Sequence, residues 1–250
     1  MYKILVSDKL SEDAIKMLKN EKDIECTVKT GLSEEQLAEE LPNYDALIIR
    51  SASKVTAKVL EKVKKLKVIG RAGVGVDNVD MPAATSKGVI VMNTPDANTL
   101  STAEQTITLI LGMARNLPQA DASLKAKKWE RPKFTGIELY GKTLGVIGLG
   151  RIGSEVVKRM QAFGMKIIGY DPFVTKEKGE AMGIEIGTVT DVIKNADIIT
   201  VHVPKTKETT NLITAKEIAE MKDGVMLVNC ARGGIYNEKD VAEGLKSGKI

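Results

Sequence analysis

The most informative part of this sequence is the stretch Thr143-Leu-Gly-Val-Ile-Gly-Leu-Gly-Arg-Ile-Gly153, followed by Ile167-Ile-Gly-Tyr-Asp171. Residues 144–147 predict a short buried strand, and the glycines of a Gly-x-Gly-x-x-Gly turn come directly after it. Apolar residues then recur at helical spacing from 151 to 163. A second strand ends at Asp171. A strand, a glycine turn, a helix and an acidic residue in this register indicate a dinucleotide-binding unit.

Each residue of this pattern has a physical role in holding a dinucleotide. Gly148 permits the tight turn, Gly150 lets the backbone approach a pyrophosphate, and Gly153 lets the helix pack closely on the strand. The free N–H groups and the dipole at the start of the helix favour phosphate. Asp171 would accept hydrogen bonds from the adenosine ribose and repel the extra phosphate of NADP. The expected cofactor is therefore NAD.

Composition narrows the class of protein. The chain has 250 residues, enough for two domains, and it is 43% hydrophobic and 28% charged. A net charge of +4 is too small to indicate a nucleic-acid partner. The single histidine, His202, argues against a histidine-based metal site, and we expect no metal. Cys26 and Cys230 form no motif. With no signal peptide and no membrane-length apolar segment, we expect a cytoplasmic protein.

Strands and helices alternate along the whole chain, which predicts an α/β fold with two doubly wound parallel-sheet domains. The expected strands are 3–7, 24–28, 46–50, 67–70 and 89–93 in the first half, and 144–147, 166–170, 198–201 and 225–229 in the second. We expect residues 1–98 to form a flavodoxin-like substrate domain. Residues 99–250 are expected to form a Rossmann NAD-binding domain that lacks its last strand.

Local signals place several helices. Ser33-Glu-Glu-Gln36 has the spacing of a capping box, and Pro82 is expected in the first turn of the fourth helix. The lysine-rich run 58–67 keeps apolar residues at helical spacing and predicts a helix with a solvated lysine face. Residues 99–116 predict a long helix that leads from the first domain to the second. Trp129 either packs locally or is exposed at a subunit interface.

Polar residues cluster after three of the expected strands, where open parallel sheets bind their ligands. Arg50, Ser51 and Ser53 suit a phosphate or carboxylate, because a guanidinium group and hydroxyls can share its oxygens. Further along the chain, Arg71 precedes Gly73 and Gly75, which leave the amides of Val74 and Gly75 open to an anionic oxygen. The third cluster is Asn229-Cys-Ala-Arg-Gly-Gly234, in which Arg232 could reach across a cleft.

Two other residues are weaker candidates for chemistry. His202 ends a strand on the cofactor side, so it is expected to line the nicotinamide pocket or only to pack, rather than to act as a catalytic acid. Cys230 has no base near it in sequence, which argues against a nucleophile.

These clusters, in this order, resemble the D-2-hydroxyacid dehydrogenases over the whole chain. The resemblance is carried by Arg50-Ser-Ala-Ser-Lys-Val-Thr56, Gly70-Arg-Ala-Gly-Val-Gly-Val-Asp-Asn78, Met92-Asn-Thr-Pro-Asp-Ala-Asn98, Trp129-Glu-Arg, Gly148-Leu-Gly-Arg-Ile-Gly153, Tyr170-Asp-Pro172 and Asn229-Cys-Ala-Arg-Gly-Gly234. It implies reversible hydride transfer between NAD and the 2-hydroxyl carbon of a D-hydroxy acid. The segments at Arg50 and Asn98 point to the branch that acts on a small, anionic, phosphorylated hydroxy acid.

The same resemblance implies a role for each site residue. Arg232 would be the catalytic residue that holds the substrate carboxylate and carbonyl oxygen. The substrate site would comprise Arg50, Ser51, Arg71, Gly73, Val74, Gly75 and Asn98. The cofactor site would comprise Val74, Gly148, Gly150, Arg151, Ile152, Gly153, Asp171, His202, Val203, Cys230, Ala231 and Arg232.

The family's proton-donating histidine and its partner glutamate follow the last strand of the nucleotide domain, and this sequence ends before either. We therefore expect a C-terminally truncated, inactive chain whose first domain lacks its returning segment. The resemblance also implies a homodimer or higher homo-oligomer. Two alternatives remain: a reductase of glyoxylate or hydroxypyruvate, and a non-catalytic NAD-sensing protein like the family's corepressors. The latter would need no phosphate pocket, so Arg50, Ser51 and Arg71 argue against it.

Overall fold

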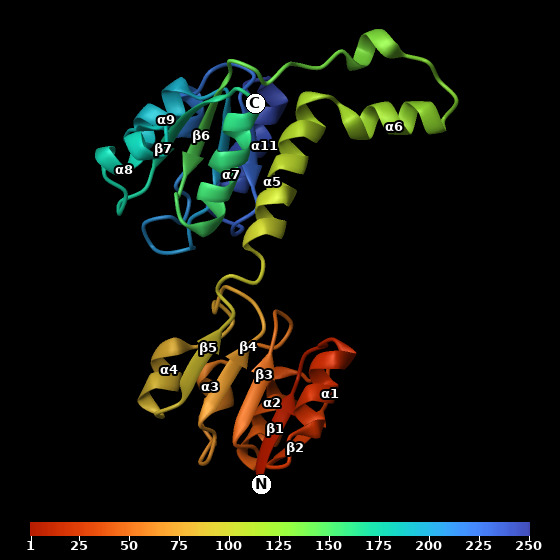
Figure 1. Cartoon of the computed structure of the whole chain (residues 1–250), viewed down its shortest axis with the longest axis vertical. Helices are drawn as coiled ribbons and strands as arrows, with labels where there is room; N and C mark the ends of the chain where they lie inside the picture. The colour runs from red at the N-terminus through yellow and green to blue at the C-terminus, as the bar shows by residue number, and fades with distance from the viewer. The chain divides into compact units, whose positions relative to one another are not determined.

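The chain divides into two compact units, residues 1–98 and 99–250, in a computed structural model that describes all of residues 1–250 (Figure 1). Each unit contains one five-stranded sheet, and every strand pair in both sheets is parallel. Parallel strands need crossover connections, and a helix lies in each connection between successive strands of both sheets. The predicted α/β class with two doubly wound sheets is confirmed.

The first sheet has the strand order β2-β1-β3-β4-β5, which is the flavodoxin-like order. Its strands are β1 (Tyr2–Val6), β2 (Ile24–Val28), β3 (Ala46–Ile49), β4 (Val68–Arg71) and β5 (Ile90–Asn93). Its helices are α1 (Glu12–Asn20), α2 (Glu34–Glu40), η1 (Leu41–Asn43), α3 (Ala57–Leu60) and α4 (Met81–Ser86). Leu5, Leu47 and Ile69 of the central strands are fully buried in the core that this sheet shares with α2 and α3.

The second sheet has the order β10-β9-β6-β7-β8, so its first strand, β6, lies at the sheet centre, and after β8 the chain crosses to β9 on the other side of β6. This is the Rossmann order, with its switch point between β6 and β9. The strands are β6 (Thr143–Ile147), β7 (Lys166–Tyr170), β8 (Glu185–Ile186), β9 (Ile198–Val201) and β10 (Met226–Asn229). The helices between and after them are α7 (Arg151–Ala162), α8 (Lys176–Ala181), α9 (Val189–Asn195), α10 (Ala215–Glu220) and α11 (Glu238–Ser247).

The cap signals were predicted correctly. Ser33 accepts from the amide of Gln36 and the Gln36 side chain returns to the Ser33 amide, which is a complete capping box. Pro82 lies in the first turn of α4 behind the N-cap Asp80.

The prediction of a helix over 58–67 was wrong. The helix α3 ends at Leu60, and the chain continues in turns to β4. Val63 and Leu66 are nevertheless buried, and the Val63 amide donates to the Leu60 carbonyl. Apolar residues three positions apart can face the core from successive tight turns as well as from a helix. The pattern therefore predicted which side chains are buried, but not the backbone conformation that buries them.

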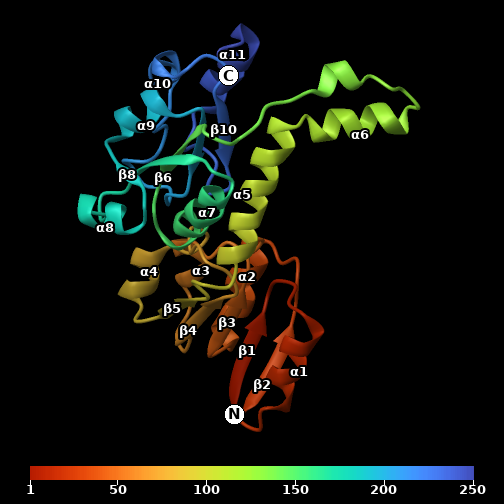
Figure 2. The same cartoon turned by 45° about the horizontal axis from the view of Figure 1, so that its top comes forward.

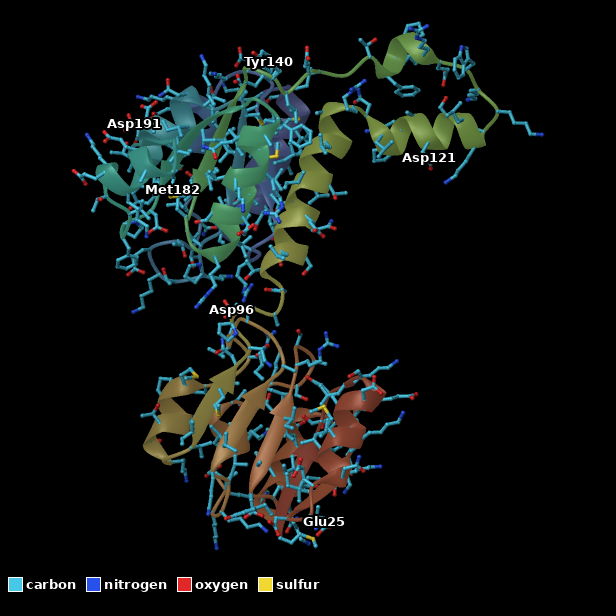
Figure 3. The ribbon with its side chains drawn as sticks, viewed as in Figure 1. Glu25, Asp96, Asp121, Tyr140, Met182 and Asp191 are labelled. Atoms are coloured by element: carbon cyan, nitrogen blue, oxygen red, sulfur yellow. The ribbon has the colours of Figure 1, made fainter.

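An arm projects from the second unit (Figures 1 and 2). It consists of α6 (Leu117–Lys125), η2 (Arg131–Phe134) and the loops beside them, and it follows the long helix α5 (Thr99–Ala114). Figure 3 labels Asp121 on α6, where its carboxylate pairs with Lys125 at 2.7 Å. Trp129 is 79% exposed, which excludes local packing, the first of the two alternatives for this residue.

None of the helices combines the length and the apolar character that crossing a bilayer requires.

Candidate functional site

The glycine turn after β6 has the geometry of a dinucleotide-binding turn. Gly148 has φ +99°, and a Cβ there would lie 2.8 Å from the carbonyl group of His202. A Cβ on Gly153 would lie 2.0 Å from the Gly148 oxygen, because α7 packs directly on the turn. No atom lies within 4 Å of a Cβ placed on Gly150, the N-cap of α7. The three glycines thus differ as the sequence predicts: two make close contacts, and the middle one faces open space.

The first N–H groups of α7 have no acceptor within the helix itself. No side chain caps the helix start, and these amides lie at the end of the helix where the dipole is positive. Arg151 and Ile152 are the first helical residues; Arg151 is exposed and Ile152 half-buried. A negatively charged group bound over Gly150 would meet these donors, and the residues therefore fit the pyrophosphate of a dinucleotide.

Asp171 lies at the end of β7 and faces the glycine turn. One carboxylate oxygen accepts from the Leu149 amide at 2.8 Å, and the other accepts from the Phe173 amide at 2.9 Å. Each oxygen has a second lone pair for a further donor. The carboxylate is therefore oriented by the backbone and can still accept hydrogen bonds from ribose hydroxyls.

His202 follows β9 and is mostly buried. Its Nε2 lies 3.1 Å from the Thr200 hydroxyl, whereas its Nδ1 is buried without a hydrogen-bond partner. Desolvation lowers the pKa of the imidazole to about 4, so the ring is neutral near pH 7. The His202 backbone is the wall against which Gly148 packs, and a Cβ on Gly148 would also come within 2.9 Å of Val203.

In the loop after β10, the Asn229 side chain clamps the backbone on both sides of Arg232's peptide bond to Ala231. The Asn229 side chain donates to the Arg232 carbonyl at 2.8 Å and accepts from the Ala231 amide at 2.9 Å. Arg232 itself donates to the Ala231 carbonyl. Cys230 and Ala231 are half-buried beside it. Asn229, Ala231 and Arg232 line one wall of a cavity of about 400 Å³. Asn229 ends the strand in the predicted motif, but its clamping role is visible only in the structure.

In the first unit, Arg71 and Ser51 meet beyond the ends of β4 and β3. An Arg71 guanidinium nitrogen donates to the Ser51 hydroxyl at 3.2 Å, and the Arg71 Nε is buried without a partner. The guanidinium lies so close to Gly73 that a Cβ there would be 2.1 Å from Nη1. Arg50 is exposed at the start of the same loop and reaches the Lys9 carbonyl at 3.4 Å. Two cations and a hydroxyl therefore gather at one edge of the sheet.

The loop from Gly73 to Gly75 is held from the neighbouring strand. The Gly73 carbonyl accepts from the Thr94 amide at 3.0 Å, and the Val74 carbonyl accepts from the Asn93 side chain. With both carbonyls bonded on that side, the loop is fixed at the same edge as Arg71. Asn98 is the exposed last residue of this unit.

The sequence analysis missed Asp8 and Asn78. Asp8 follows β1 and is 5% exposed, and its carboxylate bonds the loop that carries Arg50 and Ser51. Asn78 bonds the same loop from the other side. A carboxylate directly after a buried strand was the available signal for Asp8. Asn78 ends the motif that begins at Gly70, but the sequence analysis gave roles only to the arginine and to the segment from Gly73 to Gly75.

Known proteins resemble the chain closely. The sequence profile of the D-isomer-specific 2-hydroxyacid dehydrogenase family, NAD-binding domain, matches residues 107–250. A D-3-phosphoglycerate dehydrogenase of Methanocaldococcus jannaschii is 57% identical over the whole chain, and one of Bacillus subtilis is 48% identical. The chain covers 48% and 47% of these two proteins, and so spans about half the length of the curated relatives that it matches.

Among solved structures, D-lactate dehydrogenase of Aquifex aeolicus, complexed with NAD and lactic acid, superposes with a TM-score of 0.89 at 31% identity. The match covers 99% of this chain and 74% of that protein.

Proposed function

The chain belongs to the D-isomer-specific 2-hydroxyacid dehydrogenase family, and from that premise we propose that it serves the NAD-dependent oxidation of D-3-phosphoglycerate to 3-phosphohydroxypyruvate, the first step of serine biosynthesis. The observation that carries the choice of substrate is the cluster of Arg50, Ser51 and Arg71. A substrate without a second anionic group would leave this cluster, with its buried and unpartnered Arg71 Nε, without a ligand. The names of the relatives support the same choice.

The second unit carries the family's NAD-binding domain, and its residues fit the cofactor part by part. The α7 amides behind Gly150 would hold the pyrophosphate with Arg151 and Ile152, and Asp171 would hold the adenosine ribose. Val203, Cys230 and Ala231, with the neutral His202, would surround the nicotinamide. Bound NAD would supply the hydride acceptor for carbon 2 of the substrate, and the residues of the protein would bind and orient both molecules.

The substrate has two anionic groups, and we assign them to different residues. Arg232 would bind the carboxylate and the carbon-2 oxygen, stabilising the negative charge that develops there. The amides at Gly73, Val74 and Gly75 would share the carboxylate. The remaining residues, Arg50, Ser51, Arg71 and Asn98, would lie at the phosphate end.

Exchanging Arg50 for alanine tests this assignment. Loss of a charge-assisted hydrogen bond is worth about 1.5–3 kcal/mol, so Arg50→Ala should weaken 3-phosphoglycerate binding by roughly 10- to 150-fold and barely change that of glycerate. Lys54→Ala, which removes an equal charge from the same loop, is the control and should have a small effect. Calorimetry in the presence of NADH measures both ligands.

Other outcomes would support the rival functions. Equal losses for both ligands would mean that Arg50 is structural or binds the carboxylate, as in a reductase of glyoxylate or hydroxypyruvate. Binding of NAD without binding of either acid would favour a non-catalytic NAD sensor.

We also propose that the protein is a homodimer in the cytoplasm, joined through its second units. The arm exposes large apolar side chains: Leu117 and Leu124 on α6, and Trp129 beyond it. Such a surface on a projecting arm is typical of an interface. Sedimentation at micromolar concentration checks the proposal, and a monomer would contradict it.

A further inference from the structure

A buried carboxylate lies beneath the proposed phosphate loop. Asp8 accepts from the Arg50 amide at 2.6 Å, from the Ser53 amide at 3.1 Å and from the Ser53 hydroxyl at 2.8 Å. The Ser53 hydroxyl also lies 2.8 Å from that of Ser7. Asp8 and Ser53 are each 5% exposed, so these bonds are shielded from water. They fix the first and last residues of the loop 50–53 from the inside of the sheet.

Asn78 fixes the same loop from its carbonyl side. Its amide nitrogen donates to the carbonyl of Arg50 at 2.8 Å and to that of Ser53 at 2.7 Å. Asp8 and Asn78 thus occupy both amides and both carbonyls at the two ends of the loop. Ser51 and Ala52 between them are exposed, and their amides donate to no group of the chain. Between these two fixed ends, the Ser51 hydroxyl accepts from the Arg71 guanidinium at 3.2 Å.

The charge of Asp8 has the wrong sign for an anion site. Taken alone, a carboxylate behind this loop would repel a bound phosphate and weaken its binding. Its bonds to the loop act in the opposite direction, because they hold the donors in a geometry that a free loop would have to be ordered into on binding. We propose that Asp8 is a positioning residue for phosphate binding and that Asn78 is its partner. The proposal rests on the proposed function, since it needs the loop 50–53 to bind phosphate.

The substitution Asp8→Asn distinguishes positioning of the loop from charge repulsion, because the two effects change phosphate affinity in opposite directions. It removes the charge and one strong acceptor at nearly constant volume. If positioning dominates, affinity for 3-phosphoglycerate falls by about 10- to 100-fold, whereas NAD affinity and glycerate affinity stay within about twofold. If repulsion dominates, 3-phosphoglycerate binds more tightly, which overturns the proposal. The control is Asp45→Asn, because the Asp45 carboxylate also bonds a backbone amide, that of Lys3 at 2.8 Å, at the opposite end of the same sheet. It should leave every affinity unchanged.

Hydrogen exchange supplies a readout that does not depend on the ligand. Asp8→Asn should speed amide exchange in residues 50–56 and leave residues 143–171 unchanged. Unchanged exchange in both segments would overturn the proposal. Should this variant fail to fold, Asn78→Ala decides: a selective loss of 3-phosphoglycerate binding supports the proposal, and an equal loss for glycerate or no loss overturns it. If the unmodified chain prefers glycerate to 3-phosphoglycerate, the proposed function fails first, and the role of Asp8 with it.

Discussion

At the scale of single residues, we propose that Asp171 determines the preference for NAD over NADP. Asp171→Ala should lower NAD affinity by about tenfold, because a charge-assisted bond to the ribose is lost, and should leave NADP affinity equal or higher, because a repulsion is removed. The ratio of NAD affinity to NADP affinity, measured by calorimetry, should therefore fall. Asp223→Ala is the control, since it removes a carboxylate that is 91% exposed and paired with Lys249 in the same unit. Tighter binding of NADP than NAD by the unmodified chain would refute the role of Asp171.

The burial of His202 predicts a dependence of stability on pH. Its folded pKa of about 4 lies below the usual 6.5, so the unfolded chain binds the proton more strongly. The stability is fully present above pH 6.5 and is lost as the pH falls toward 4, with about 2 kcal/mol lost between pH 7 and pH 5. Urea unfolding at these two pH values measures it. His202→Gln should reduce the difference by that amount, and an unchanged difference would show that other groups cause it.

At the scale of helices and strands, substitutions at Gly153 and Gly150 distinguish the packing of α7 on the glycine turn from the access of a ligand to that turn. Gly153→Ala places a methyl group 2.0 Å from the Gly148 oxygen, so α7 must shift at a cost of about 1–3 kcal/mol. Its melting temperature and its NAD affinity should both fall. Gly150→Ala meets no protein atom within 4 Å and has an ordinary φ of −68°, so it should change the melting temperature little. It should still weaken NAD binding, because its methyl group enters the space assigned to pyrophosphate. Equal melting temperatures for the two variants would contradict this distinction.

The sequence predicted the elements whose signals are local. The strand at Leu144–Ile147, the glycine turn and the capping box at Ser33 depend on neighbouring residues, and the structure has all three. The short edge strand β8, of two residues, was missed because its pairing with β7 is its only signature. The clamps at Asp8 and Asn229 were missed for a related reason. They satisfy backbone groups of loops, and the loop path is known only once the strands are placed.

At the scale of the whole molecule, each unit presents polar residues beyond the carboxyl ends of its strands. In the first unit these are Arg50, Ser51 and Arg71, which we propose as donors for phosphate, and in the second they are the glycine turn before α7 and the loop of Arg232. The two sheets differ in strand order, but both are parallel, so each places all such ends at one edge, to which we assign the substrate site in the first unit and the cofactor site in the second. The different ligands that we assign to the two units follow from the side chains at these strand ends.

Cofactor binding and turnover should therefore separate in this 250-residue chain. The glycine turn, Asp171 and the strands that hold them are all present, so NAD should bind. Reduction of a keto acid also needs a proton delivered to the carbonyl oxygen, which typically contributes about 10²- to 10⁴-fold to the rate. His202 is the only histidine, and its low pKa keeps the ring in its neutral form near pH 7, which is a poor general acid. Arg232 can polarise the carbonyl, but a guanidinium group does not release a proton.

The measurement is NADH oxidation with phosphohydroxypyruvate, beside a full-length relative such as the Methanocaldococcus jannaschii enzyme. We expect NADH to bind and its oxidation to be at least about 100-fold slower, because the general acid is missing from the groups described above. Comparable rates would contradict this expectation and place the acid within residues 1–250. In that event His202→Gln would test the one histidine: loss of activity would assign the proton to His202 despite its burial, and retained activity would exclude His202.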